Sequence, residues 1–417
     1  MGQEKRKVVV VGAGIVGVST ALWLARDGHR VTLIDRAGPG EAASFGNAGL
    51  LASAATLPVT GPGLLRKAPR MVLDPRQPLY LRLRHLPALW PWLRRYLRHA
   101  NSEAAQARAD AILPLIGDSL ADHTALAADT PAEKYVIPCD YLHGYPDRAG
   151  YEADSFAWNT RQRQGFDFSV KDSAEIRAYD PIYGDAIGCV VKIRNHGRIS
   201  DPGQYVKALA QAAEALGTRM LRGTVTGIAR ESGKVTGVRL DGQTIECDTV
   251  VIAAGAWSKT LAETLGVTVP LHPESGFHME LWAPSHMPKA PLMFAPGKFM
   301  ITPMDGRIRL AGMVGYSGFD APAPELPYRM FLHHLKAALP RLEWQDCTRW
   351  MGHRPSMADS LPMIGPVPGV AGAFTGFGHD HVGLTAGPGT GRILAQMIAG
   401  KRPNIDVRPF APERFKA

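Results

Sequence analysis

Three glycines near the start of the chain, Gly12, Gly14 and Gly17, have the spacing G-x-G-x-x-G. They follow an apolar run, VVVV, and precede a helical pattern, and a second short apolar run then ends at Asp35. The first glycine permits a tight turn, the second lets the backbone approach a pyrophosphate, and the third lets the helix pack closely on the strand. Free N–H groups at the helix start favour phosphates, and Asp35 can accept from a ribose hydroxyl. This segment therefore predicts a dinucleotide-binding site.

A second glycine-rich segment lies near the other end of the chain, where GFGHDHVGLTAGPGTG precedes a helix predicted over 391–398. Backbone N–H groups in such a loop and at a helix start favour the polar edge of a ligand. A third segment of small residues, AGPGEAASFGNAGLLA, follows Asp35, and its glycines let the backbone lie against a flat ligand. A plain surface loop is the alternative interpretation of this third segment.

One arginine and two histidines near the second glycine-rich segment have side chains suited to binding and catalysis. Arg354, in an R-P pair, offers a planar fork of donors that fits a carboxylate at two points, and a structural ion pair is the alternative. His379 and His381 form an H-x-H pair. Two histidines are too few for a closed metal site and no clear set of Asp, Glu or Cys joins them, so we expect no metal and favour a ligand contact.

The composition is that of a soluble globular protein, with 45% hydrophobic and 20% charged residues, and a length of 417 residues suits two to three domains. The net charge of +9 suits an anionic cofactor, a carboxylate substrate, a membrane surface or nucleic acid without selecting among them. The four cysteines are far apart, which argues against a zinc knuckle and fits a reducing cytoplasm. We expect neither a signal peptide nor a membrane-spanning helix.

Further strands and helices are predicted between the two glycine-rich ends and must hold these residues in place. Asp201, Pro202 and Gly217 mark the cap, first residue and stop of a helix. Ser-Gly and Asp-Gly turns predict a small β-meander over 218–248. The other predicted elements are a helix pair over 102–130, strand-like segments over 135–200, a strand over 249–258, and strands over 270–345 with a helix at 328–339.

The segment 80–98 is basic and aromatic and allows two interpretations. It can lie on an anionic membrane surface, with Trp90, Trp92 and Tyr96 at the interface. It can also be an ordinary amphipathic helix that packs on its own domain, with its arginines extending into solvent. We favour the packed helix slightly over the membrane contact.

Together, these segments resemble the family of FAD-dependent D-amino acid oxidases and dehydrogenases, and most of all the small subunits of its bacterial D-amino acid dehydrogenases. Glycine oxidase and sarcosine oxidase are more distant. The resemblance covers nearly the whole chain. Its carriers are VVVVGAGIVGVSTALWLARDGHRVTLIDR, SFGNAGLL, VVIAAGAWS, GRIRLAGMVGYSGFD, GHRPSMADSLPMIG and GFGHDHVGLTAGPGTGRIL.

The resemblance implies an α/β fold in which two domains are interleaved. One is a Rossmann-like FAD-binding domain of the D-amino acid oxidase and glutathione reductase type, and the other is an α+β substrate domain that carries a mixed sheet. We predict that residues 1–60, 200–268 and 346–417 form the FAD-binding domain. The substrate domain would take residues 61–199 and 269–345.

The resemblance also assigns contacts to FAD. The pyrophosphate would be held by Gly12, Gly14, Ile15, Val16 and Gly17, and the adenosine ribose side by Asp35 and Arg36. Ser44, Asn47, Gly49 and Leu50 would lie beside the phosphates and the flavin, Val225 would contact adenine, and Ala254, Gly255 and Trp257 would cover the nucleotide. The isoalloxazine would be lined by Gly378, His379, Val382, Gly383, Leu384 and Thr385. The SMADSLPMIG segment lacks the cysteine that tethers flavin in sarcosine oxidases, so we expect non-covalent FAD.

In the family, the arginine at the position of Arg354 pairs with the substrate carboxylate. The implied reaction is oxidative deamination of a D-amino acid: hydride leaves the α-carbon for flavin N5, and water converts the imino acid to a 2-oxo acid and ammonia. His379 and His381 are candidates for tuning the charge of the amine or the flavin. Two departures stand out: Phe277 replaces a tyrosine frequent in dehydrogenase relatives, and His381 stands where glycine oxidase has an arginine.

The implied partners are a small amino acid and an electron acceptor, with no nucleic acid. The acceptor would be a membrane quinone, reached through residues 80–98, in a cytoplasmic protein that can lie on the inner membrane face. Two alternatives stay open. One is an oxygen-using oxidase of the glycine or sarcosine type, or a D-hydroxyproline dehydrogenase, and the other is a flavoprotein subunit without turnover of its own.

Overall fold

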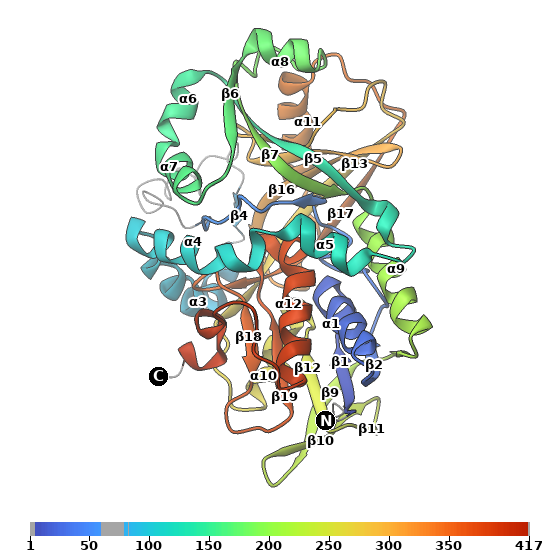
Figure 1. Ribbon diagram of the computed structural model, residues 1–417. Helices are drawn as coiled ribbons and strands as arrows, with labels where there is room; N and C mark the ends of the chain where they lie inside the picture. Colours follow the sequence, from blue (N-terminus) through green and yellow to red (C-terminus); the bar gives the residue numbers. More distant parts are fainter. Residues whose placement is uncertain (1–4, 60–78, 82, 416–417) are drawn as a thin grey trace.

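The structure is a computed structural model that describes residues 5–59, 79–81 and 83–415, and it is built around two large β-sheets (Figure 1). The first is a six-stranded sheet of order β18-β19-β12-β1-β2-β8. Its strands are β1 (Lys7–Val11), β2 (Arg30–Asp35), β8 (Arg219–Arg222), β12 (Thr249–Ile252), β18 (Met363–Pro366) and β19 (Ala373–Phe377). All neighbouring pairs are parallel except β18 and β19, so the glycine-rich turn after β1 opens at the carboxyl edge of a parallel sheet.

Two helices from opposite ends of the chain pack side by side on the six-stranded sheet, as Figure 1 shows. They are α1 (Ile15–Arg26) and α12 (Gly383–Ile398), and α9 (Pro202–Ala215) lies on the other side of α1. Gly391 allows the contact, because a Cβ there would lie 2.7 Å from the backbone of α1 at Ser19 and Thr20. As predicted, Asp201 caps α9 by accepting from the Gln204 N–H group.

The second sheet has ten strands and forms the upper half of the molecule in Figure 1. Its main path has the order β17-β13-β16-β15-β14-β5-β7-β3, with β4 on β16 and β6 on β7. These strands are β3 (Leu50–Leu51), β4 (Leu79–Leu81), β5 (Val136–Tyr145), β6 (Phe168–Asp172), β7 (Cys189–Ile199), β13 (Leu271–Trp282), β14 (Leu292–Phe294), β15 (Phe299–Met304), β16 (Arg307–Tyr316) and β17 (Asp346–Met357). It is a mixed sheet, since most pairs are antiparallel while β14 with β5 and β16 with β4 are parallel.

Other helices surround the ten-stranded sheet and the junction between the sheets. They are α3 (Leu86–Arg98), α4 (Ser102–Ile116), α5 (Ser119–Ala127), α6 (Arg148–Ala153), α7 (Ser155–Arg163), α8 (Ser173–Tyr179), α10 (Ser258–Glu263) and α11 (Leu326–Ala338). The predicted meander is present as β9 (Val225–Glu231), β10 (Lys234–Leu240) and β11 (Gln243–Glu246). Short 3₁₀ turns complete the chain: η1 (Leu83–His85), η2 (Glu133–Tyr135), η3 (Gly255–Trp257), η4 (Asp380–Val382), η5 (Arg408–Phe410) and η6 (Pro412–Phe415).

Two predictions of local structure were wrong. The C-terminal helix begins at Gly383 rather than at Gly391, so half of the predicted loop is helical, including Pro388 inside the helix. The cause is tertiary packing, since the glycines that suggested a loop let α12 lie close to α1. The strand predicted over 249–258 also ends early, at Ile252, because the turn η3 begins at Gly255 and α10 at Ser258.

The packing of α3 bears on the two interpretations of residues 80–98, a packed helix and a membrane contact. Trp92 and Tyr96 are buried and stack on one another at 4.4 Å, and the Trp92 indole donates to the Ser356 carbonyl. Their burial agrees with the packed helix, which the sequence favoured slightly, and contradicts the placing of these two residues at a membrane interface. Trp90 is 58% exposed on the outer face. Within the described part of the chain, no helix is long and apolar enough to cross a membrane.

The predicted domain boundaries do not all coincide with a change of sheet. The strand β17 begins at Asp346, where the FAD-binding domain was predicted to resume, yet it pairs along its whole length with β13 of the ten-stranded sheet. The two residues of β3 likewise pair with β7. The chain thus passes between the two sheets within both segments, and the domain division stays a prediction.

Candidate functional site

A cavity of about 1250 Å³ lies between the two sheets and is lined by residues from both glycine-rich ends of the chain. It brings together most of the residues predicted from the sequence. Those that line it are Gly12, Gly14, Ile15, Val16, Asp35, Arg36, Ser44, Asn47, Leu50, Val225, Ala254, Gly255, Trp257, Arg354, Gly378, His379, His381, Val382, Gly383 and Leu384. Segments separated by more than three hundred residues therefore form one continuous site.

The other predicted residues, Gly17, Gly49 and Thr385, shape the backbone around the cavity. A Cβ at Gly17 would collide with the Gly12 carbonyl oxygen, so this glycine sets the close approach of α1 to β1. Gly49 has a φ of +77°, and a Cβ there would lie 2.8 Å from the Ile199 carbonyl oxygen. The Thr385 hydroxyl accepts from the Ala52 N–H group. These three residues thus act through packing.

The turn after β1 has the geometry expected of a phosphate-binding loop. Gly12 has a φ of +105°, and a Cβ there would lie 2.5 Å from the Ala253 carbonyl oxygen, so a side chain is excluded. The Ser44 hydroxyl accepts from the Ile15 N–H group at 2.9 Å and covers the start of α1. Ser44 thus occupies the first N–H group of α1, and the residues of the turn and of the helix start line the cavity.

Asp35 is held by backbone donors. One of its oxygens accepts from the Ala13 N–H group at 2.8 Å, and the other accepts from Ala37 and Gly38. The carboxylate therefore ties the turn after β1 to the turn after β2. A carboxylate has further lone pairs, so the predicted contact with a ribose hydroxyl stays a prediction.

Arg36 and Trp257 form one wall of the cavity. The Arg36 guanidinium lies 3.8 Å from the centre of the Trp257 ring, a cation–π contact, and Trp257 stacks on Phe319 at 5.0 Å. Both contacts fix the indole beside the turn that begins at Gly255. This wall combines a charged guanidinium with an aromatic ring, and the predicted covering of a nucleotide by Trp257 stays a prediction.

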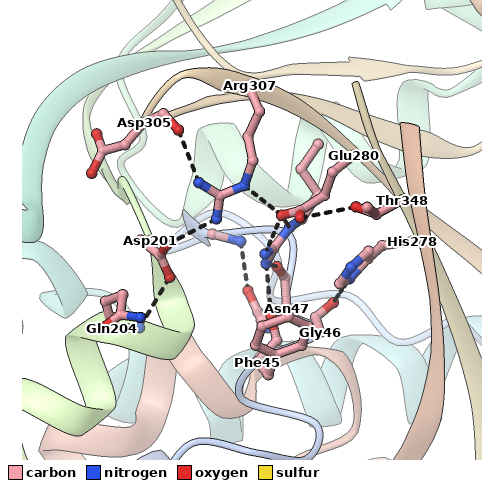
Figure 2. A network of polar contacts seen from close by, with 12 residues as sticks. Phe45, Gly46, Asn47, Asp201, Gln204, His278, Glu280, Asp305, Arg307 and Thr348 are labelled. Atoms are coloured by element: carbon pink, nitrogen blue, oxygen red, sulfur yellow. Dashed lines mark hydrogen bonds and ion pairs between the residues drawn. The ribbon is translucent and has the colours of Figure 1, made fainter. Parts of the chain in front are cut away.

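A buried ion network attaches the 44–50 segment to the ten-stranded sheet, as Figure 2 shows. Arg309 on β16 is fully buried and pairs with Glu280 on β13. The same guanidinium donates to the carbonyl oxygens of Phe45 and Asn47 at 2.8 and 2.6 Å. Arg307 pairs with Glu280 and with Asp201, the residue that caps α9. One carboxylate thus holds two arginines that together fix the 44–50 segment and the start of α9.

Arg354 lines the cavity and belongs to a second ion network. Its Nη1 donates to Glu274 Oε1 at 2.8 Å and to the Met313 carbonyl oxygen at 3.1 Å. His381 Nε2 lies 3.0 Å from the same Glu274 oxygen. Tyr316 donates to the other oxygen of Glu274 at 3.3 Å. The structural ion pair considered for Arg354 is therefore present, and it lies within a site that also faces the cavity.

The electrostatics of Glu274 follow from its burial and its partners. Burial alone would raise the pKa of this carboxyl group, but His381 and Arg354 together bring the pKa down to about 2. The carboxylate is 2% exposed, while the side chains of Arg354 and His381 are 19% and 37% exposed. Glu274 is thus an ionised group that lies beneath two basic side chains of the cavity wall.

Two backbone features place the Arg354 guanidinium. Gly276 lies beneath it, and a Cβ there would lie 2.5 Å from the Arg354 Cζ atom. On β16, the pairing with β13 skips Met313, which has a φ of +53°. This β-bulge directs the Met313 carbonyl oxygen to the guanidinium.

His379 and Asp380 are buried groups next to His381. Burial lowers the pKa of His379 to about 3, and its ring contacts the Thr390 hydroxyl at 3.0 Å. A neutral, buried ring does not suit the charge-tuning role that the sequence suggested for His379. Burial raises the pKa of Asp380 to about 7, with Glu274 acting in the same direction and His381 and Arg108 opposing it. Asp380 accepts from the Met357 N–H group at 2.9 Å.

Sequence reasoning missed several residues of the site, above all Glu274, Tyr316 and Asp380. A signal for Glu274 was present, since it alternates with apolar residues in ESGFHMEL as a strand with one polar face does. Phe277 lies on the apolar face of that strand, 1% exposed and 6.0 Å from the Tyr328 ring. Phe277 therefore points into the core, and the hydroxyl next to Glu274 belongs to Tyr316.

Comparisons with known proteins agree with this geometry. Residues 7–397 match the family model described as FAD dependent oxidoreductase. A D-amino-acid oxidase of Bradyrhizobium diazoefficiens is 36% identical over 99% of both chains, and a D-amino acid dehydrogenase of Rhizobium johnstonii is 30% identical over 98% of this chain and 100% of its own. The glycine oxidase of Bacillus cereus has a similar fold, with a TM-score of 0.72, 24% identity and 96% of each chain covered.

We predict that Arg309→Met weakens the binding of FAD. The variant removes both hydrogen bonds from Arg309 Nη1 to the 44–50 segment and leaves Arg307 as the ion partner of Glu280. We therefore expect a loss of about 3–5 kcal/mol in unfolding free energy. Denaturant titration of the apoprotein and reconstitution with FAD measure the two effects. Arg349→Met, which breaks a more exposed pair with Glu325, is the control, and equal behaviour of the two variants would contradict the prediction.

A second prediction concerns pH. The pKa of Asp380 is about 7 in the folded chain against an ordinary 3.8, so its stabilising contribution is complete below the unfolded value and is lost as the pH rises through about 7. Asp380→Asn keeps an acceptor for the Met357 N–H group and cannot ionise. Between about pH 5 and about pH 8, the Tm of the wild type should therefore fall relative to that of the variant. Asp167→Asn at an exposed pair is the control, and parallel profiles for wild type and Asp380→Asn would refute this account.

Proposed function

This chain belongs to the FAD dependent oxidoreductase family, and we propose that it deaminates D-amino acids oxidatively to 2-oxo acids and ammonia. The observation that carries the proposal is the guanidinium of Arg354 on the cavity wall, held in place by Glu274 and the Met313 carbonyl oxygen. Relatives named D-amino-acid oxidase and D-amino acid dehydrogenase, at 36% and 30% identity over almost the whole chain, support this substrate class.

The residues around the cavity fit FAD. Gly12 and the start of α1 would hold the pyrophosphate, since a side chain at residue 12 is excluded and the helix end faces the cavity. The ribose would lie by Asp35 and Arg36, the adenine by Val225, and Ala254, Gly255 and Trp257 would cover the nucleotide. The 44–50 segment and the 378–385 segment would enclose the isoalloxazine. We propose that FAD binds without a covalent link.

The chain's own contribution to the reaction is binding and orientation. FAD, when bound, supplies the acceptor for the hydride of the substrate's α-carbon, at flavin N5. Arg354 would bind the substrate carboxylate through the donors that its partners leave available, and a two-point contact fixes the direction of the α-hydrogen. Loss of a hydride and a proton gives an imino acid, and water then gives the 2-oxo acid and ammonia. His381 also lines the cavity, and its Nε2 lies 3.0 Å from the Glu274 oxygen that holds Arg354.

The electron acceptor is proposed to be a quinone in the membrane, with oxygen as the alternative favoured by the relative named oxidase. Helix α3 supports the quinone. Leu89, Leu93 and Leu97 on its inner side line the cavity, and its outer side exposes Trp90 and basic side chains. The exposed arginines of α3 are Arg94, Arg95 and Arg98, and Arg84 in the preceding turn η1 is exposed as well. A basic face with an exposed indole suits the surface of an anionic bilayer.

We predict that D-amino acids reduce the holoenzyme without oxygen and that Arg354→Ala loses about 10²–10⁴ in kcat/KM, because a charged anchor for the carboxylate is removed. Anaerobic bleaching of the flavin is followed with D- and L-amino acids, glycine, sarcosine and D-hydroxyproline. Arg349→Ala, on the same strand at an exposed position, is the control.

Near-normal kinetics of Arg354→Ala would refute the carboxylate role. Bleaching by glycine or sarcosine alone would favour the oxidase alternative, and no bleaching by any amine would leave a flavoprotein without turnover. Mixing the reduced enzyme with air or with a soluble quinone in a stopped-flow instrument then decides the acceptor.

We predict that the holoenzyme binds vesicles of phosphatidylglycerol but not of phosphatidylcholine at low ionic strength. Each arginine near an anionic surface contributes about 1 kcal/mol, and the attraction is screened at about 1 M salt. Flotation of vesicles measures the bound fraction. Charge reversal at Arg94, Arg95 and Arg98 should abolish binding, whereas reversal at Arg148, Arg177 and Arg194 should not. Retention of the first variant on the vesicles would exclude α3 as the contact.

A further inference from the structure

Glu274 is an acidic residue buried in a site that is proposed to bind an anion. Its carboxylate lies on β13 directly opposite Arg354 on β17, where the two antiparallel strands pair residue by residue. A single oxygen, Oε1, contacts Arg354 Nη1 at 2.8 Å and His381 Nε2 at 3.0 Å. The site therefore holds two basic side chains on one buried atom.

These two basic side chains come from different parts of the fold. Arg354 lies within β17 of the ten-stranded sheet. His381 lies in η4, the turn that precedes α12, on the side of the cavity that faces the six-stranded sheet. Both line the cavity, whereas Glu274 is 2% exposed. The buried Glu274 carboxylate thus connects the two basic residues that line different parts of the cavity wall.

Charge shows why a second basic group matters. The pair of Arg354 and Glu274 has no net charge. The Glu274 carboxylate would also compete with the substrate carboxylate for the donors of Arg354. His381 Nε2 contacts the same Glu274 oxygen, and its ring is a second polar group on the cavity wall beside the guanidinium. Tyr316 donates to the other oxygen of Glu274, so the carboxylate is fixed at both ends.

We propose that Glu274 is a positioning residue that holds Arg354 and His381 side by side, so that both bind the carboxylate of the substrate. The inference rests on the proposed function and adds His381 as a second anchor. Gly276 contributes because it leaves room for the guanidinium to lie flat on the strand. A carboxylate anchored by two groups from two segments is fixed in direction as well as in place.

The test is the binding of benzoate to the holoenzyme, followed by the change in flavin absorbance. Benzoate offers a carboxylate and no transferable hydride, and benzylamine offers the amine without the carboxylate. Glu274→Gln keeps the size of the side chain and removes its charge. We expect the Kd of benzoate to rise about tenfold, the Kd of benzylamine to stay constant, and KM to rise far more than kcat falls.

Matched variants separate positioning from general destabilisation. Glu325→Gln removes the carboxylate partner of Arg349, an exposed arginine on β17, the strand that also carries Arg354. It should leave the Kd values of benzoate and benzylamine unchanged. His381→Gln should also raise the Kd of benzoate about tenfold. In the double variant of Glu274 and His381, the effects should be less than additive, because one acts through the other.

A wild-type Kd for benzoate in Glu274→Gln or in His381→Gln would overturn the proposal, as would additive effects or failure of the wild type to bind benzoate. If Glu274→Gln does not retain FAD, the His381→Gln titration decides alone. Benzoate binding needs no turnover. A wild type that binds benzoate but is not reduced by any D-amino acid would therefore reject the proposed function while leaving the carboxylate site intact.

Discussion

The contact of the Arg309 guanidinium with the backbone of residues 45 and 47 connects the two halves of the molecule. The 44–50 segment leaves the six-stranded sheet, covers the start of α1 through Ser44, and joins the ten-stranded sheet at β3. Arg309 holds this passage in place while Glu280 neutralises the buried charge. Because the cavity lies between the sheets, its shape depends on this connection.

Both ion networks place a buried carboxylate between basic groups. Taking such charges out of water costs several kcal/mol for each ion, so the networks are a weak argument for net stability. Their effect is better described as positional. Glu280 satisfies two arginines that bind backbone oxygens, and Glu274 satisfies Arg354 and His381 at the cavity wall. Removing Glu280 would leave the buried Arg309 guanidinium without its carboxylate, which costs more than replacing the whole pair by apolar residues.

The parts of the fold that depend on local chemistry were predictable from the sequence. The glycine turn after β1, the cap at Asp201 and the Asp-Gly and Ser-Gly turns of the meander all follow from conformational preferences of single residues. The start of α12 was not predictable in this way, because its glycines serve contact with α1 rather than a loop. Glu274 escaped notice for a related reason: its partners are 80 and 107 residues away, and the strand register that joins the first of them cannot be derived from a local pattern.

One strand carries both networks, and this limits how the site can change. Glu274, Gly276, His278 and Glu280 alternate along β13 and so lie on one face, while Phe277, Met279 and Leu281 pack in the core on the other. On this polar face, Glu274 pairs with Arg354, and Gly276 lies beneath the guanidinium. Further along the strand, His278 contacts the Gly46 carbonyl oxygen and Glu280 pairs with Arg309. A shift of the strand by one residue would turn all four toward the core. The separation between the proposed substrate anchor and the loop beside the cofactor is therefore set by the strand's own rise of about 3.3 Å per residue, and the two ends of the site cannot move independently.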